Sequence, residues 1–134
     1  MGAGGVRDER LGDVSRSQLE VVAGKAHYNG RPLADWVDDV AARIFDRSEA
    51  TKIVVFGSVQ RGDDGPDSDI DLLVVLPSVS RRHDDAVRVL RELRDLPVPV
   101  DVTVIDEAAL GDRLREPGLI RVAMREGRVL ERVA

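Results

Sequence analysis

The chain has 134 residues, of which 43% are hydrophobic and 34% charged, a balance typical of one globular domain rather than of a disordered chain. A formal net charge of −5 and an aromatic content of 3% argue against tight binding of DNA or RNA, which needs a basic patch or stacking platforms. The absence of cysteine excludes disulfides and thiolate metal sites.

The first part of the chain, residues 1–18, mixes Gly, Arg, Asp and Ser with few apolar residues and predicts a flexible N-terminal tail. It lacks the apolar core of a secretory signal, and no stretch of the chain is apolar for long enough to span a bilayer. We therefore expect a cytoplasmic protein without membrane association, and a single domain over residues 19–134.

The first half of this domain allows a short strand and predicts a turn and a helix. Residues 19–28 are ambiguous, with enough Val and Ala for a short strand. Asn29-Gly30 predicts a tight turn, and Pro32 suits the first turn of a helix. Apolar residues then recur at helical spacing over residues 33–45, with charged residues between them, which predicts an amphipathic helix.

Two buried strands follow, joined by a polar segment. Residues 53–56 are fully apolar and run into Gly57-Ser58, a pair that can turn tightly and open a helix. Residues 63–67 contain Gly and Pro and predict an exposed loop, and residues 70–76 predict the second strand.

The next elements are a helix and a third strand. Ser80 is a candidate N-cap for the helix, in which Asp84 and Arg88 have the favourable order for an i,i+4 ion pair. Residues 100–105 predict a strand that Asp101 interrupts.

The chain closes with two short helices and a strand. Asp106 is a candidate cap for a helix through Leu114, residues 117–124 predict a last helix that Gly127 can end, and residues 129–130 predict a short closing strand. Strands that alternate with helices at this spacing predict an α/β (α+β) domain, with a small mixed β-sheet and helices packed mainly on one face.

Three carboxylates point to metal chemistry. Asp69 and Asp71 stand two residues apart at the start of a strand, where side chains i and i+2 share a face, so two like charges would lie close together unless a cation neutralises them. Asp101 would complete the cluster if its strand lies beside residues 70–76. Three carboxylates match a two-metal site, and oxygen ligation favours Mg²⁺, with Mn²⁺ as an alternative.

The segment before this acid pair fits phosphate binding. Gly57 lets the backbone approach an oxygen closely, and Ser58 with the following N–H groups would hold phosphates at a helix N-terminus. Arg61 offers a charged fork to the same phosphates. Together these parts predict nucleotidyl transfer.

Simpler readings compete with parts of this site. Asp101 can also stand at a solvated strand edge, and Arg61 can simply pair with Asp63 or Asp64. We expect Asp63, Asp64 and Asp67 to be solvated loop charges.

The run GSVQRGDDGPDSDIDLLVV, residues 57–75, resembles the nucleotidyltransferase superfamily of the DNA polymerase beta type. The signature of that superfamily is Gly-Ser, a spacer, Asp-x-Asp and a later acid on a neighbouring strand. This chain supplies it in order as Gly57, Ser58, Asp69, Asp71 and Asp101. The form is most similar to the minimal nucleotidyltransferase (MNT) subfamily, and LIRVAMREGRVL, residues 119–130, is similar to the end of such domains. The resemblance covers roughly residues 39–130.

The resemblance implies the nucleotidyltransferase fold and a specific activity. MNT proteins are commonly encoded beside a HEPN-domain ribonuclease, and the MNT partner transfers AMP from ATP to a tyrosine of this toxin. The implied function is therefore a Mg²⁺-dependent protein adenylyltransferase that acts as a type VII-like antitoxin, with ATP as substrate and a HEPN toxin as partner. Metal binding and catalysis would fall to Asp69, Asp71 and Asp101, and nucleotide binding to Gly57, Ser58 and Arg61.

The acceptor is the open part of this prediction. Longer relatives that modify antibiotics carry an extra helical domain after the core, whereas this chain ends just after it, so we expect the acceptor hydroxyl on another protein. Two other functions remain: an antitoxin that neutralises its partner by binding alone, and a small-molecule nucleotidyltransferase that needs a helical partner subunit.

Overall fold

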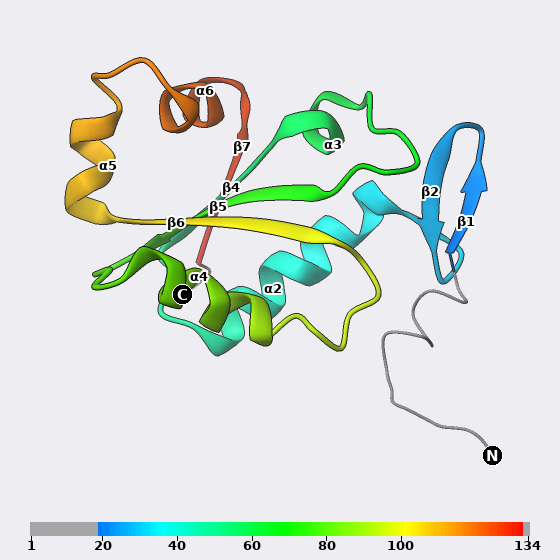
Figure 1. Ribbon diagram of the computed structural model, residues 1–134, viewed down its shortest axis with the longest axis horizontal. Coiled ribbons are helices and arrows are strands. Elements are labelled where there is room, and N and C mark those ends of the chain that lie inside the picture. Colours follow the sequence, from blue (N-terminus) through cyan, green and yellow to red (C-terminus); the bar gives the residue numbers. More distant parts are fainter. Residues whose placement is uncertain (1–18, 133–134) are drawn as a thin grey trace.

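The computed structural model describes residues 19–132, which form two β-sheets with helices around the larger one (Figure 1). The predicted tail, residues 1–18, lies outside the described residues. In chain order the elements are β1 (Leu19–Val22), β2 (Lys25–Tyr28), β3 (Arg31–Pro32), the 3-10 helix η1 (Leu33–Trp36), α2 (Val37–Arg47), β4 (Lys52–Phe56), α3 (Gly57–Arg61), β5 (Ile70–Leu76), α4 (Arg82–Arg91), β6 (Val100–Asp106), α5 (Glu107–Arg113), α6 (Leu119–Glu126) and β7 (Arg128–Glu131).

The small sheet is an antiparallel unit of β1, β2 and β3 at the N-terminal end of the described chain. The predicted turn at Asn29-Gly30 is confirmed, with positive φ angles of 53° and 79°. Pro32 ends β3 and stands at the N-cap of η1, rather than inside a helical turn. Arg31 anchors the sheet to the first helix, because its guanidinium is 2.7 Å from the Asp39 carboxylate and lies over the Trp36 ring.

The large sheet has the strand order β6-β5-β4-β7 and is mixed, as predicted. Strand β4 runs antiparallel to both β5 and β7. Strands β5 and β6 are parallel, because the connection through α4 returns the chain to the same end of the sheet. This parallel pair brings residues separated by 30 positions into direct register.

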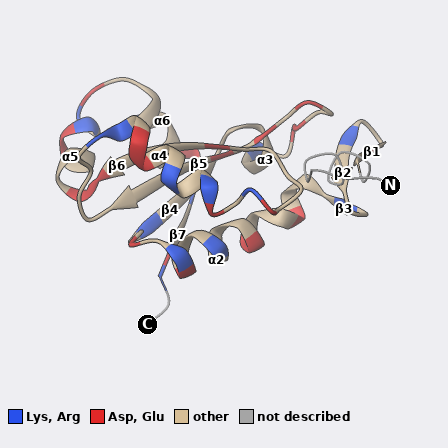
Figure 2. Ribbon diagram, turned by 60° about the horizontal axis from the view of Figure 1, so that its bottom comes forward, with Lys and Arg blue, Asp and Glu red and all other residues tan. Residues whose placement is uncertain are grey.

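Helices cover both faces of this sheet, but unequally. The larger apolar cluster lies between the sheet and the helices α2 and α4, and it takes in Ile70, Leu72 and Val74 of β5. A smaller cluster joins Leu73 and Val75 to α5 and α6 on the opposite face. The larger core therefore lies on one face of the sheet, as predicted, and α5 and α6 add a smaller one on the other face. The charged residues of α2, red and blue in Figure 2, lie on the side of that helix away from the sheet.

Two expectations about α4 are wrong. The N-cap residue is Arg81 rather than Ser80, and it makes no side-chain cap hydrogen bond. Instead, Asp85 accepts a hydrogen bond from the Ser80 N–H at 3.2 Å, so a carboxylate inside the helix satisfies the preceding loop. Arg88 pairs with Asp85 rather than with Asp84, because Asp85 is on the buried side of the helix and Asp84 points to solvent.

The later elements follow the prediction closely. The Asp106 carboxylate caps α5 by accepting the Ala109 N–H at 2.7 Å, and Gly127 ends α6. A Cβ at Gly127 would lie 2.6 Å from the Val54 side chain, so glycine is needed where α6 packs on β4. None of the helices within residues 19–132 has the length and apolar character to cross a membrane.

Candidate active site

The strand register brings two of the predicted acids together. Asp71 on β5 is directly opposite Asp101 on the parallel strand β6, and on its other side it faces Phe56 of β4. Residues directly opposite one another on neighbouring strands point to the same face, so both carboxylates project from one side of the sheet. That side is the α5 and α6 face, since Asp71 alternates with the buried Leu72 of the main core.

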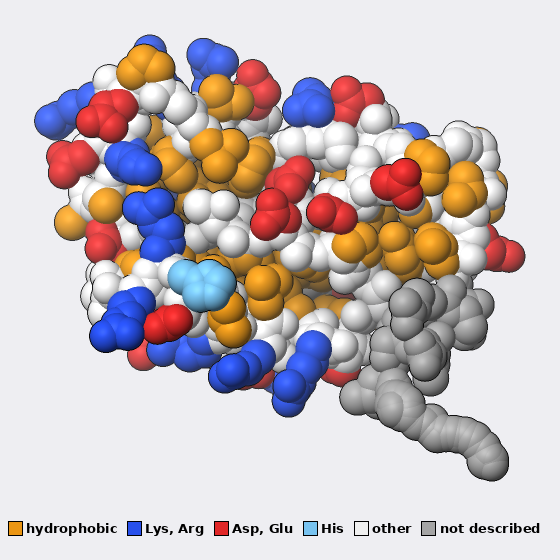
Figure 3. Space-filling model, viewed as in Figure 1, with side chains coloured by type: hydrophobic (Ala, Val, Ile, Leu, Met, Phe, Trp, Pro, Cys, Tyr) orange, Lys and Arg blue, Asp and Glu red, His pale blue; other side chains and the backbone are white. Residues whose placement is uncertain are grey.

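The acids occupy the part of this face that the helices leave open. Helices α5 and α6 cover one half of it, and α3 lies beyond the other half (Figure 1). In the space-filling view, acidic side chains gather over β5 and β6 next to α3 (Figure 3). Asp101 is exposed on an edge strand, as the alternative reading held, but this position also sets it beside Asp71.

Glycine at position 57 is required by the Asp71 side chain. Gly57 has a φ of +81°, and a Cβ there would overlap the Asp71 carboxylate, with the Cγ atom only 3.1 Å away. The turn between β4 and α3 is therefore in contact with the acid that it precedes by 14 positions. The close backbone approach predicted for this glycine is made to a carboxylate of the site itself.

The Asp71 carboxyl is held in an unfavourable electrostatic setting. Burial raises its pKa, the negative charges of Asp101 and Asp69 raise it further, and Arg61 opposes them. No hydrogen bond from residues 19–132 contributes to its pKa. Two like charges therefore lie close to a partly buried carboxylate, which is the arrangement that a bound cation relieves.

Asp69 stands just before β5 and is exposed. Burial raises the pKa of Tyr28, and the negative charges of Asp69 and Asp67 raise it further. The sequence did not single out this tyrosine. Tyr28 belongs to β2, so the N-terminal sheet lies next to the acids. An isolated tyrosine in an ambiguous segment carries no signal that would have revealed this.

The segment between the Gly-Ser turn and the acids is closed by a hydroxyl network. Ser58 Oγ donates to Ser68 Oγ at 3.1 Å, and Ser68 Oγ also accepts the Gly65 N–H at 2.8 Å. The first turn of α3 has no side-chain cap. Its N–H groups are therefore not occupied by an N-cap side chain, as phosphate binding there would require.

The loop acids Asp63 and Asp64 form ion pairs with different partners. Arg61 pairs with Asp63 at 3.2 Å, as the alternative interpretation of this arginine held. Its positive charge also lowers the pKa of Asp71. The expectation that Asp64 is a solvated loop charge is wrong: its side chain is 2% exposed and pairs with Lys25 at 3.1 Å. A salt bridge to a lysine 39 positions earlier cannot be read from local sequence.

The carboxylate oxygens of this site suit a hard cation that takes only some of its ligands from the protein. Within residues 19–132, no three carboxylate or imidazole side chains converge closely enough to hold a metal by themselves. Mg²⁺ is usually held by one or two carboxylates, with water and substrate phosphates as its other ligands. Asp71 and Asp101 lie in register and offer only oxygen ligands, so they match that requirement. Asp69 lies near enough for its charge to raise the pKa of Asp71.

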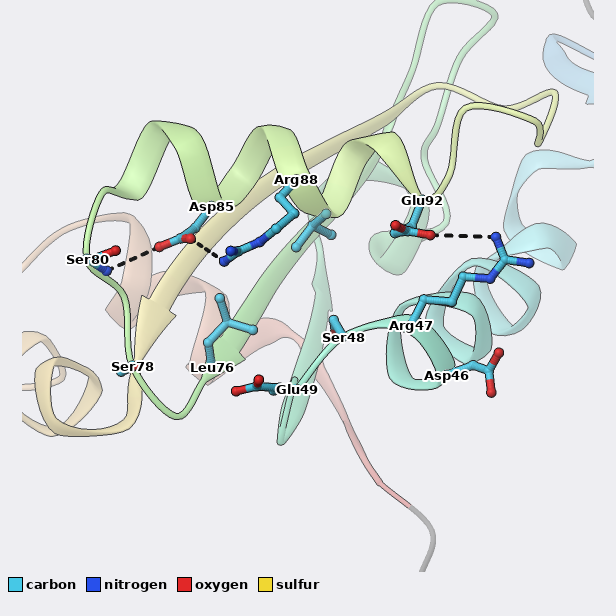
Figure 4. Close-up of a pocket in the computed structure, with 11 residues that line it drawn as sticks. Asp46, Arg47, Ser48, Glu49, Leu76, Ser78, Ser80, Asp85, Arg88 and Glu92 are labelled. Atoms are coloured by element: carbon cyan, nitrogen blue, oxygen red, sulfur yellow. Dashed lines mark hydrogen bonds and ion pairs between the residues drawn. The ribbon is translucent and has the colours of Figure 1, made fainter.

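A cavity lies at the opposite end of the sheet from these acids. It has a volume of about 630 Å³ and is bounded by the end of α2, the last residue of β5 and α4 (Figure 4). Four of its six charged side chains are paired, Arg88 with Asp85 and Arg47 with Glu92 at 3.6 Å. None of the predicted site residues lines it.

The nucleotidyltransferase domain family matches residues 39–130, which is most of the chain and includes all of the predicted site residues. The chain belongs to this family. Its members transfer a nucleotidyl group from a nucleoside triphosphate and typically use divalent metal ions. A solved structure from Sulfolobus solfataricus, described as a "putative nucleotidyltransferase", is 22% identical, with a TM-score of 0.48 over 79% of this chain and 82% of its own. No curated protein matches the chain.

Proposed function

We propose that this nucleotidyltransferase transfers AMP from Mg-ATP to a hydroxyl of a partner protein. The observation that carries the proposal is the set of contacts around Asp71: it is in register with Asp101 and packs against Gly57 of the Gly-Ser turn. The acids proposed to bind metal and the turn proposed to bind phosphate thus lie against one another, which supports transfer from a triphosphate.

Each residue of the site has a separate proposed role. Asp71 and Asp101 would hold Mg²⁺, with Asp69 beside them. When bound, the ion would supply charge neutralisation at the phosphates and lower the pKa of the attacking hydroxyl. The start of α3, with Gly57 and Ser58, would receive the triphosphate.

The transfer step balances without a further reactant. The acceptor hydroxyl oxygen forms a bond to the α-phosphorus of ATP, the bond between that phosphorus and the oxygen bridging to the β-phosphate breaks, and pyrophosphate leaves. Asp101 is exposed on the edge strand, so we place it on the acceptor side, where it can take the hydroxyl proton or help to hold the ion.

The finer identity of the acceptor follows the MNT resemblance of residues 57–75 and 119–130. On this basis we propose a tyrosine of a HEPN-domain toxin as acceptor, and an antitoxin role for this chain. Acidic and basic residues are interspersed along the described chain (Figure 2), which suits a protein partner better than a polynucleotide.

The test is to incubate the protein with Mg-ATP and the product of the adjacent gene, and to measure the intact mass of each chain. We expect AMP to be added to the partner, and titration calorimetry with Mg²⁺ and a non-hydrolysable ATP analogue to give the number of ions, which we propose is two. A partner without added AMP, when metal and nucleotide are bound, would falsify protein adenylylation.

Two further measurements separate the rival functions. If Asp69→Asn/Asp71→Asn still neutralises the toxin in cells, the chain acts by binding alone. If AMP is added to a small hydroxylated acceptor without any protein acceptor, the chain is a small-molecule nucleotidyltransferase. The proposed function predicts that the double variant fails to neutralise and that small acceptors remain unmodified.

A further inference from the structure

The N-terminal sheet touches the loop that joins the two halves of the proposed site. This sheet precedes residues 39–130, the part matched by the family. The loop between α3 and β5 extends toward β2 (Figure 1). There, Lys25 Nζ donates to the Gly62 carbonyl oxygen at 2.8 Å and to Asp64 Oδ1 at 3.1 Å. One side chain thus holds both the start and the interior of the loop.

The Asp64 carboxylate makes this contact strong. Its side chain is only 2% exposed, whereas that of Lys25 is 41% exposed. A carboxylate that is buried without a cation is costly, so the loop can keep Asp64 inside only while Lys25 is present. Within residues 19–132, Lys25 is its one ion-pair partner.

The same loop sets the distance between the phosphate-binding turn and the acids. On its inner side, Ser68 links Ser58 to the Gly65 N–H group. On its outer side, Lys25 links the loop to β2. The two ties together fix a polar segment that has little apolar packing of its own, since Asp64 is its one buried residue between positions 60 and 69.

We propose that Lys25 is a positioning residue for the active site: the N-terminal sheet clamps the loop of residues 62–69 and so keeps the start of α3 aligned with Asp69 and Asp71. Lys25 acts through the loop and does not itself touch the nucleotide. Its catalytic consequence rests on the proposed function, whereas the clamp can be measured without it.

The experiment compares Lys25→Met with Lys52→Met, because Lys25 and Lys52 are the two lysines of the chain. Lys52 pairs with Glu107 at 3.9 Å on the surface, away from the loop. Hydrogen exchange of the full chain should become about tenfold faster in residues 62–69 for Lys25→Met and remain unchanged for Lys52→Met. Unchanged exchange in the Lys25 variant overturns the clamp, whether or not the protein transfers AMP.

Kinetics then test the consequence for catalysis. We expect Lys25→Met to raise the KM for ATP about tenfold and to lower kcat less, because the start of α3 is where the triphosphate binds. Lys25→Arg should recover much of the loss, since it keeps a charged donor.

A double variant distinguishes positioning from mere charge neutralisation. Lys25→Met/Asp64→Leu removes the unpaired buried charge, so its thermal stability should recover while its KM stays raised. Full recovery of KM in this double variant would show that Lys25 only neutralises Asp64, and it would overturn the positioning role. A wild-type chain that transfers no AMP, but whose loop exchange depends on Lys25, contradicts the proposed function and leaves the clamp supported.

Discussion

Asp71 and Asp85 lie near opposite ends of β5 and have opposite electrostatic surroundings. Asp85, on α4 past the C-terminal end of β5, is buried, accepts the Ser80 N–H and pairs with Arg88. Asp71, near the N-terminal end, is partly buried beside Asp101 and Asp69, and its pKa is raised. The first carboxylate has donors from the protein, whereas the second has mainly like charges around it.

This difference separates a structural acid from a functional one. A buried carboxylate with its own donors stabilises the native state and leaves nothing for a ligand to satisfy. A carboxylate among like charges destabilises the protein slightly until a cation binds, which is the signature of a ligand site. The two acids therefore predict opposite responses to the same kind of substitution.

The largest expected effect is on catalysis at Asp71. Asp71→Asn should lower AMP transfer by about 1,000-fold, because it removes a negatively charged ligand at the metal. Its melting temperature without metal should equal or exceed that of the wild type, since a like charge is gone. Labelled ATP and calorimetry measure both quantities. Retained transfer in a folded Asn variant would contradict the assignment of the site.

The contact between the turn and the acid gives the second prediction. Gly57→Ala should lower transfer by about 100-fold, because its Cβ displaces the Asp71 carboxylate. Gly30→Ala is the matched control, with a φ of +79° and no atom within 4 Å of the added Cβ. Both variants should lose about 1–2 kcal/mol from backbone strain, measured by urea unfolding. Equal transfer rates per folded molecule would show that the Gly57 contact has no catalytic role.

Asp85 should show the reverse pattern. Asp85→Ala should lower the free energy of unfolding by about 1 kcal/mol, because it removes the acceptor of the Ser80 N–H and the ion-pair partner of Arg88. The neighbouring Asp84, whose side chain is 64% exposed, provides the control: Asp84→Ala should change stability by less than about 0.5 kcal/mol. Transfer per folded molecule should be unchanged in both, and a loss in Asp85→Ala would remove the distinction between the two acids.

The smallest effect is the pH dependence of stability in metal-free protein. The folded-state pKa of Asp71 lies above its unfolded value, so its favourable contribution is present below the unfolded pKa and is lost as pH rises through the folded pKa. Above the ordinary aspartate pKa, the wild type should therefore lose stability relative to Asp71→Asn, by less than about 1 kcal/mol. Adding Mg²⁺ should raise the melting temperature of the wild type and leave the variant unaffected.

Local patterns were sufficient for most of the framework. An apolar run predicted β5 correctly and a candidate capping residue predicted the cap at Asp106, because these features depend on neighbours within a few positions. The cap of α4 was missed because Asp85 satisfies the loop from inside the helix, an option that competes with a serine cap and leaves no distinct pattern. Asp64 was missed because its partner, Lys25, comes from a separate sheet.

For the site itself, the sequence by itself determined the residue types and their spacing: a glycine-serine turn, two acids two positions apart and a third acid in a later strand. Only the tertiary structure decided which of these meet. The parallel register of β5 and β6 sets Asp71 beside Asp101, and the packing of Gly57 against Asp71 joins the turn to the acids. These contacts depend on how distant strands pair, which is fixed by burial of the whole sheet between its helices rather than by any local run of residues.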